Sequence, residues 1–165
     1  MNAALAFAGA GNEAGKNSLT DGLRQLGEDG RSTAVEVGLP LVEGAWAFAR
    51  EAYDETIRLM APAISRIEGV GGSNAQHEVY WDALIEAYLR TDRFAEAETL
   101  QRSRLEPRAT VRDLFRLGRA QIGAGKLEEG TANLRQAAED WRGADSGSPE
   151  VAAIDQLLER FASVH

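Results

Sequence analysis

The fold is decided by residues 81–105, WDALIEAYLRTDRFAEAETLQRSRL, and by their counterpart at residues 114–138, LFRLGRAQIGAGKLEEGTANLRQAA. Residues at equivalent places in the two stretches are separated by a constant 33 positions. The first set is Trp81, Leu84, Ile85, Tyr88, Phe94, Ala97 and Leu105, and the second is Leu114, Leu117, Gly118, Gln121, Leu127, Gly130 and Ala138. Weaker copies lie upstream, at residues 44–56 and 6–26. Such a period is typical of helical hairpins that stack and bury their apolar faces against one another.

Apolar residues also recur with the period of an α-helix over nearly the whole chain. Ile57, Met60 and Ile64 are spaced three and four apart, for example, which places them on one face. No stretch alternates apolar and polar residues with a β-branched bias, so we expect no strand. The helices predicted from these patterns are 2–10, 13–26, 33–49, 51–68, 74–90, 93–105, 111–124, 126–142 and 149–163.

The predicted fold class is therefore all-α: an α–α superhelix of hairpins in one domain, residues 1–165. The predicted hairpins are 2–26, 33–68, 74–105 and 111–142, followed by a capping helix at 149–163. Small residues, Gly118 and Gly130 among them, would let the two helices of a hairpin approach closely. Two prolines disturb the pattern: Pro62 should kink helix 51–68, and Pro40 either kinks helix 33–49 or marks its true start.

The predicted helix starts carry their own local chemistry. Ser73 and Gln76 have the spacing of a capping box, and Thr110 with Asp113 is a looser version. Gly71-Gly72 could be read as a phosphate-cradling turn, but no P-loop lysine or preceding strand accompanies it. A tight turn before a capped helix is the favoured interpretation. His77 is then expected to be a surface residue of the first turn.

Composition excludes several classes of protein. The 165 residues include no cysteine and two histidines, so a disulfide scaffold, thiol catalysis and a cysteine-based metal site are excluded. The net charge of -8 argues against a nucleic-acid partner. The apolar start at residues 3–10 lacks the cationic flank of a secretory signal. We expect a cytoplasmic protein with no membrane partner.

The period, together with a large residue, a leucine and a small residue in the first helix, resembles the tetratricopeptide repeat. Residues 37–41 (VGLPL) and 70–76 (VGGSNAQ) resemble the tetratricopeptide repeat protein 38-like family in particular. The resemblance covers roughly residues 3 to 108. It implies an α-helical repeat protein with no established catalytic residues, and hence no catalytic site, metal site or cofactor. The chain departs from the repeat where Gln101 and Arg104 replace an expected aromatic residue and an alanine.

The strongest charge anomaly is a run of arginines in this acidic chain: Arg102, Arg104, Arg108, Arg112, Arg116 and Arg119. The last three are spaced four and three apart and so share one helix face. In a tetratricopeptide hairpin that face would line the concave groove, where arginine could grip carboxylates bidentately. The alternative is structural. Asp82 and Glu86 of the preceding repeat could pair with Arg116 and Arg119.

These features predict a non-enzymatic scaffold module that binds a protein or peptide, with Arg112, Arg116, Arg119, Asp82 and Glu86 as the candidate site. The alternative is a structural or assembly subunit that self-associates through its N-terminal hairpin to give a homo-oligomer. A small uncharacterised enzyme is a third hypothesis, although no coherent set of acid, base and nucleophile is present.

Overall fold

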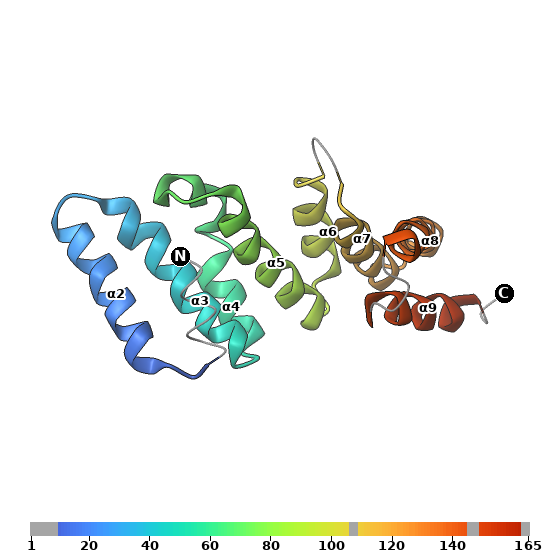
Figure 1. Ribbon diagram of the computed structural model, residues 1–165, viewed down its shortest axis with the longest axis horizontal. Helices are drawn as coiled ribbons and strands as arrows, with labels where there is room; N and C mark the ends of the chain where they lie inside the picture. The colour runs from blue at the N-terminus through green and yellow to red at the C-terminus, as the bar shows by residue number, and fades with distance from the viewer. Residues whose placement is uncertain (1–9, 106–108, 145–148, 163–165) are drawn as a thin grey trace. The chain divides into compact units, whose positions relative to one another are not determined.

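The computed structural model describes residues 10–105, 109–144 and 149–162, so the predicted helix 2–10 lies almost wholly outside the described residues. Over the described ranges the chain is helical and no strand is found, which confirms the all-α prediction. Its contacts divide into two compact units, Met1–Thr91 and Asp92–His165. The helices of both units are drawn in Figure 1.

Unit 1 contains four α-helices and two irregular helical segments among its described residues. They are α2 (Glu13–Glu28), the π-helical η1 (Ala34–Gly38), α3 (Leu39–Ala49), α4 (Tyr53–Met60), the 3₁₀-helical η2 (Ile64–Val70) and α5 (Asn74–Arg90). Helices α3 and α4 pack side by side (Figure 1). The largest fully buried side chains of this unit include Leu41, Met60, Tyr80, Leu84 and Ile85. Met60 belongs to the predicted helical stripe, and Leu84 and Ile85 belong to the predicted repeat.

The two prolines set helix boundaries in this unit. Helix α4 ends at Met60, and the chain continues through a turn into the 3₁₀ segment η2, so the prediction of one kinked helix over 51–68 is wrong. Pro62 has no N–H to donate and its ring crowds the preceding turn, so the α-helix cannot pass through it. Pro40 lies in the first turn of α3, where the π-helical η1 passes into the α-helix. Because the backbone is already helical from Ser32, the interpretation that Pro40 marks the true start of the helix is wrong.

The turn before α5 places a histidine in the interior. Gly71 and Gly72 both have positive φ, 75° and 111°, and the N–H of Ser73 donates to Gln76 Oε1 at 3.0 Å. The predicted tight turn and helix cap are confirmed. The prediction that His77 is a surface residue is wrong, because the residue is only 7% exposed and its Nε2 lies 3.1 Å from the carbonyl oxygen of Gly71. The glycine turn folds back over the first turn of α5 and covers the ring.

Unit 2 is a series of antiparallel helices, α6 (Phe94–Arg102), α7 (Val111–Gly123), α8 (Leu127–Ala144) and α9 (Pro149–Ala162). Phe94 at the start of α6 lies against Gly123 at the end of α7. Helix α9 packs on α8, where Leu134, Ala138 and Ile154 belong to one buried cluster. The predicted terminal helix is thus present and covers an apolar face of its neighbour.

Small residues allow the helices of each hairpin to approach closely. A Cβ atom on Gly118 would lie 2.9 Å from the carbonyl oxygen of Gly130, and one on Gly130 would lie 2.9 Å from the carbonyl oxygen of Gly118. The predicted role of these glycines is confirmed. In unit 1, the hydroxyl of Thr56 donates to the carbonyl oxygen of Gly44 at 3.3 Å, across α3 and α4. Both pairs are twelve residues apart, so the two hairpins touch at corresponding places.

The predicted hairpins agree with the observed helices to different degrees. Hairpins 33–68 and 111–142 correspond to α3 with α4 and to α7 with α8, although the first is more irregular than predicted. Hairpin 74–105 runs across the boundary between the two units, and hairpin 2–26 is only partly described. The single repeat domain over 1–165 and its superhelical form therefore remain predictions.

Gly118→Val should destabilise unit 2, because the new Cβ meets both the Gly130 carbonyl and the Leu134 side chain within 3 Å. We expect a loss of about 2–3 kcal/mol in the free energy of unfolding, measured by urea titration. The matched control is Gly22→Ala, whose added Cβ meets no atom within 4 Å in α2. That change should stabilise the protein by up to about 1 kcal/mol. Equal urea midpoints for the two variants would contradict this packing.

Candidate partner-binding face on helix α7

Helix α7 begins at a fully formed capping box. The N–H of Thr110 donates to Asp113 Oδ2 at 2.8 Å, and the N–H of Asp113 donates to Thr110 Oγ1 at 3.2 Å. Burial would raise the pKa of the Asp113 carboxyl, but hydrogen bonds from Thr110 and Gln101 outweigh it and hold the pKa below its usual range. The predicted cap at this position is confirmed. The sequence predicts only a looser version of a capping box, but both of its reciprocal hydrogen bonds are present.

Gln101 accounts for one departure from the repeat pattern. Its side chain is fully buried, and its Nε2 donates to Asp113 Oδ1 at 2.9 Å, joining the end of α6 to the start of α7. An aromatic ring at this place could not satisfy the buried carboxylate, and an unsatisfied buried acceptor is costly. The amide therefore stabilises the ionised capping residue and fixes where α7 starts.

Three arginines project from α7 between this cap and its C-terminal end. Arg112 is the most exposed, with 66% of its side chain accessible, and its Nη2 lies 3.8 Å from Glu150 Oε1 at the start of α9. The guanidinium of Arg119 lies 5.5 Å from the centre of the Phe115 ring. Arg116 lies between them in sequence and is half-buried. Their spacing of four and three places the three side chains on one face of α7.

Phe115 anchors this face to the next helix. Its ring packs edge-on against Trp141 of α8, with ring centres 6.3 Å apart. Phe115 is thus in contact with an aromatic residue on one side and with Arg119 on the other. Stacking on an aromatic ring holds a guanidinium in a fixed plane. Trp141 also packs against the buried cluster that contains Leu134 and Ile154.

The acidic members of the predicted site lie in the other unit. Asp82 and Glu86 are half-buried residues of α5, whereas the arginines are on α7. Within α5, Glu86 Oε1 accepts a hydrogen bond from Arg90 Nε at 2.7 Å, and this contact raises the pKa of the arginine. Pairing of Asp82 and Glu86 with Arg116 and Arg119 would join the two units, and it remains a prediction.

Sequence reasoning missed a group of linked polar side chains that holds α6, α7 and α8 together. We refer to it as the Glu98 cluster; it consists of Glu98, Arg102, Gln121, Lys126, Glu129 and Asn133. The Glu98 side chain is only 7% exposed and accepts from Lys126 Nζ and from Arg102 Nε, each at 2.9 Å. Arg102 also reaches Glu129 at 3.1 Å. Gln121, 1% exposed, donates to Glu129 at 2.9 Å and accepts from Asn133 at 2.7 Å.

The Glu98 cluster divides the arginine run into two parts. Arg102 is committed to two carboxylates inside unit 2, whereas Arg112, Arg116 and Arg119 lie on α7. Glu98 and Arg102 are four residues apart, which is a visible signal of a helix pair. Their link to Lys126 was not visible, because it depends on how α6 packs against the start of α8.

Among the described residues no group of three or more histidine, aspartate or glutamate side chains is placed to hold a metal ion. None of the described helices is long and apolar enough to cross a membrane.

Comparison with known proteins identifies no relative. No protein-family model, curated protein or solved structure matches the chain.

Glu98→Gln should make stability less dependent on pH. Hydrogen bonds from Lys126 and Arg102 lower the pKa of Glu98 from its ordinary 4.5, despite burial. Because the folded pKa is the lower one, the stabilisation is fully present above the unfolded value and is lost as pH falls through the folded pKa. At pH 7 the free energy of unfolding of the variant should be about 1–2 kcal/mol lower than that of the wild type.

The measurement is the free energy of urea unfolding between pH 7 and pH 3, compared with Glu139→Gln, which alters an exposed residue of α8. The wild type and the control should lose more stability over this range than Glu98→Gln does. If the free energy of unfolding depends on pH in the same way in all three proteins, the Glu98 cluster does not contribute to the pH dependence of stability.

Proposed function

We propose that the chain is a non-enzymatic binding module of the tetratricopeptide type, and that the arginine face of α7 binds an acidic segment of a partner protein or peptide. The observation that carries this proposal is the row Arg112, Arg116 and Arg119 on one helix face of a chain whose net charge is -8. No cofactor or metal enters the proposed function.

The geometry of α7 supports a preorganised site. The helix is fixed at its start by the Thr110–Asp113 capping box and near its middle by the contact between Gly118 and Gly130. Its arginines are thus carried on a rigid element, and binding would not require the helix to be ordered first. Rigid presentation lowers the entropic cost of association.

The chemistry of the face favours carboxylates. Arginine presents a planar fork of donors that matches a carboxylate bidentately, which a lysine ammonium cannot do. The existing contact of Arg112 with Glu150 is 3.8 Å long and largely exposed, and such pairs are worth about 0–1 kcal/mol. A partner carboxylate could replace Glu150 at little cost. The acidic character of the rest of the chain disfavours nucleic acid as the partner.

Replacing Arg112, Arg116 and Arg119 together by alanine should weaken binding of a fluorescein-labelled heptaglutamate peptide, measured by fluorescence anisotropy at low salt. Three charge-assisted contacts are lost, so we expect the dissociation constant to rise by at least about tenfold. Wild-type affinity should also fall as salt is raised.

The matched control replaces Arg24, Arg58 and Arg135 by alanine, which removes the same charge from exposed positions outside α7. It separates a local site from general electrostatic attraction. An equal loss of affinity in both triple variants, or no loss in either, would refute the assignment to α7. A heptaglutamine peptide should not bind any of the proteins.

A further inference from the structure

Lysine is rare in this chain, and one of the two lysines holds a buried carboxylate. The sequence has 18 basic residues, of which only Lys16 and Lys126 are lysines. A lysine amine can lose its positive charge by acylation, whereas an arginine stays charged in proteins. The surroundings of the two lysines therefore determine what an acylating reagent can do to the fold.

Lys126 combines an accessible amine with a contact to the interior of unit 2. It lies between Gly125, whose φ is 81°, and the first residue of α8. Its side chain is 48% exposed, so solvent reaches it at the turn between α7 and α8. Its Nζ lies 2.9 Å from Glu98 Oε2 on α6. The residue thus links the protein surface to a buried acid.

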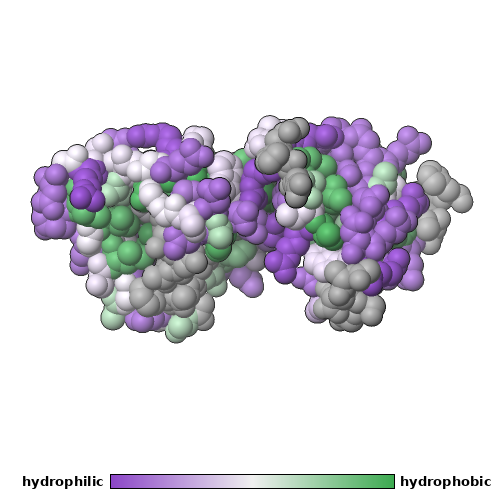
Figure 2. Space-filling view, turned by 45° about the horizontal axis from the view of Figure 1, so that its top comes forward, coloured by the Kyte–Doolittle hydropathy of each residue, from purple (hydrophilic) through white to green (hydrophobic). Residues whose placement is uncertain are grey.

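Glu98 depends on this amine because its carboxylate is buried. Figure 2 shows hydrophilic residues over much of the visible face of unit 2, but the Glu98 side chain is only 7% exposed. Each of its oxygens has one cation, because Arg102 binds Oε1 and Lys126 binds Oε2, both at 2.9 Å. Arg102 is shared with Glu129, which lies 3.1 Å away. A buried carboxylate that loses one of its charged partners destabilises the fold far more than an exposed one does.

We infer that Lys126 is a modification site, at which acylation of the amine takes one of two cations from Glu98 and loosens α6 from the start of α8. The effect extends to the start of α7, because Gln101 of α6 holds the capping residue Asp113. The inference does not depend on whether the arginine face of α7 binds an acidic partner.

The co-reactant is an acyl thioester. The ammonium of Lys126 first gives one proton to solvent, and the neutral amine then attacks the carbonyl carbon of the thioester. An N–C bond forms and the C–S bond breaks, and the leaving thiolate takes up a second proton from the nitrogen. The resulting amide keeps one N–H but carries no charge, so the ion pair with Glu98 is lost.

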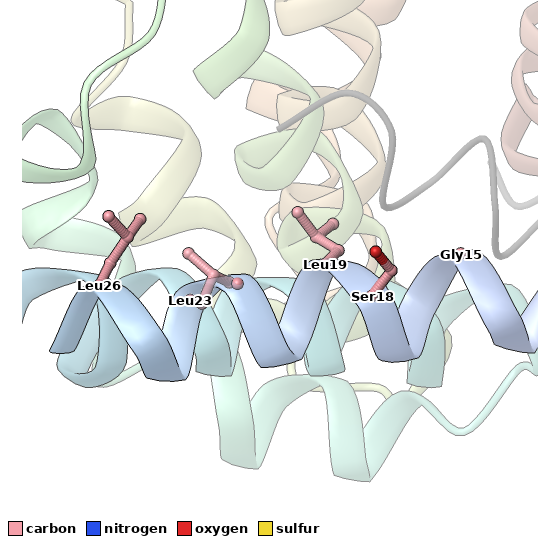
Figure 3. Close-up of a pocket in the computed structure, with 6 residues that line it drawn as sticks. Gly15, Ser18, Leu19, Leu23 and Leu26 are labelled. Atoms are coloured by element: carbon pink, nitrogen blue, oxygen red, sulfur yellow. The ribbon is translucent and has the colours of Figure 1, made fainter. Parts of the chain in front are cut away.

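Lys16 provides a matched control in the same chain. It lies on α2 between Gly15 and Ser18, which are labelled in Figure 3. Its Nζ lies 5.3 Å from the centre of the Trp46 ring. Among the described residues the two buried acids, Glu98 and Asp113, both belong to unit 2. Acylation of Lys16 therefore removes the same charge without taking a cation from a buried carboxylate.

The first experiment tests whether the amine reacts. Lys16→Arg leaves Lys126 as the one lysine of the chain, and Lys126→Arg leaves Lys16. Each full-length protein is incubated with acetyl-coenzyme A at mildly alkaline pH, and acetylation of its lysine is followed by peptide mass spectrometry. We expect Lys126 to be acetylated. If it stays unmodified under conditions that fully acetylate Lys16, the assignment of this site is overturned.

The second experiment measures the effect on the fold, with acetyl-lysine incorporated at position 126 or at position 16. Amide hydrogen exchange in α6 should become about 5- to 30-fold faster when Lys126 is acetylated. It should be unchanged when Lys16 is acetylated. Lys126→Gln should reproduce the increase, and Lys126→Arg should not, because it keeps the charge. Unchanged exchange in α6 after acetylation of Lys126 would overturn the inference.

The acetyl group also adds bulk, and a Glu98→Gln background separates bulk from charge. In that background no buried charge is left behind, so acetylation of Lys126 should change exchange in α6 by less than about twofold. An equal increase in both backgrounds would refute the role of the ion pair. If acetylation of Lys126 unfolds the protein outright, circular dichroism should show that Glu98→Gln restores folding, and a failure to do so would also contradict the inference.

Discussion

The close approach of α7 and α8 at Gly118 and Gly130 is the constraint on which the rest of unit 2 depends. Each backbone carbonyl occupies the place that a Cβ of the opposite residue would need. At this separation the two helices can adopt only a narrow range of offsets, because neighbouring side chains such as Leu134 must fit around the contact. The orientation of α7 about its axis follows, and with it the face that its arginines occupy.

Polar groups buried beside this contact make the arrangement specific. Gln101 Nε2 donates to Asp113 Oδ1 between α6 and α7, and Glu98 is held by two cations from α6 and the start of α8. A shift of one helix along another would leave these groups buried without partners, at a cost comparable to a large part of the stability of a domain. Apolar packing alone would tolerate such shifts more readily.

Much of the fold could be predicted from local signals, since these depend on near neighbours in sequence. Helix 13–26 appears as Glu13–Glu28, and helix 111–124 as Val111–Gly123, because caps and apolar stripes mark both. Pro62 was recognised as a disturbance, but whether a proline kinks or ends a helix depends on what the following residues pack against. The burial of His77 depends on the path of the glycine turn beside it, and the sequence does not record that path.

The candidate site was predictable in part for the same reason. The spacing of Arg112, Arg116 and Arg119 is local and survives in the structure as one face of α7. The role of Arg102 is not local, because Glu129 lies 27 residues further along the chain.

The most direct test of the account is a nuclear magnetic resonance titration of isotope-labelled protein with the heptaglutamate peptide. If α7 is the rigid, arginine-bearing binding element, the shifts will concentrate on the side-chain Nε–H signals of Arg112, Arg116 and Arg119 and on the amides of α7. The amide signal of Gly130, on the α8 side of the glycine contact, should move little. Shifts that instead spread over the basic residues of both units, or that are absent from α7, would contradict it.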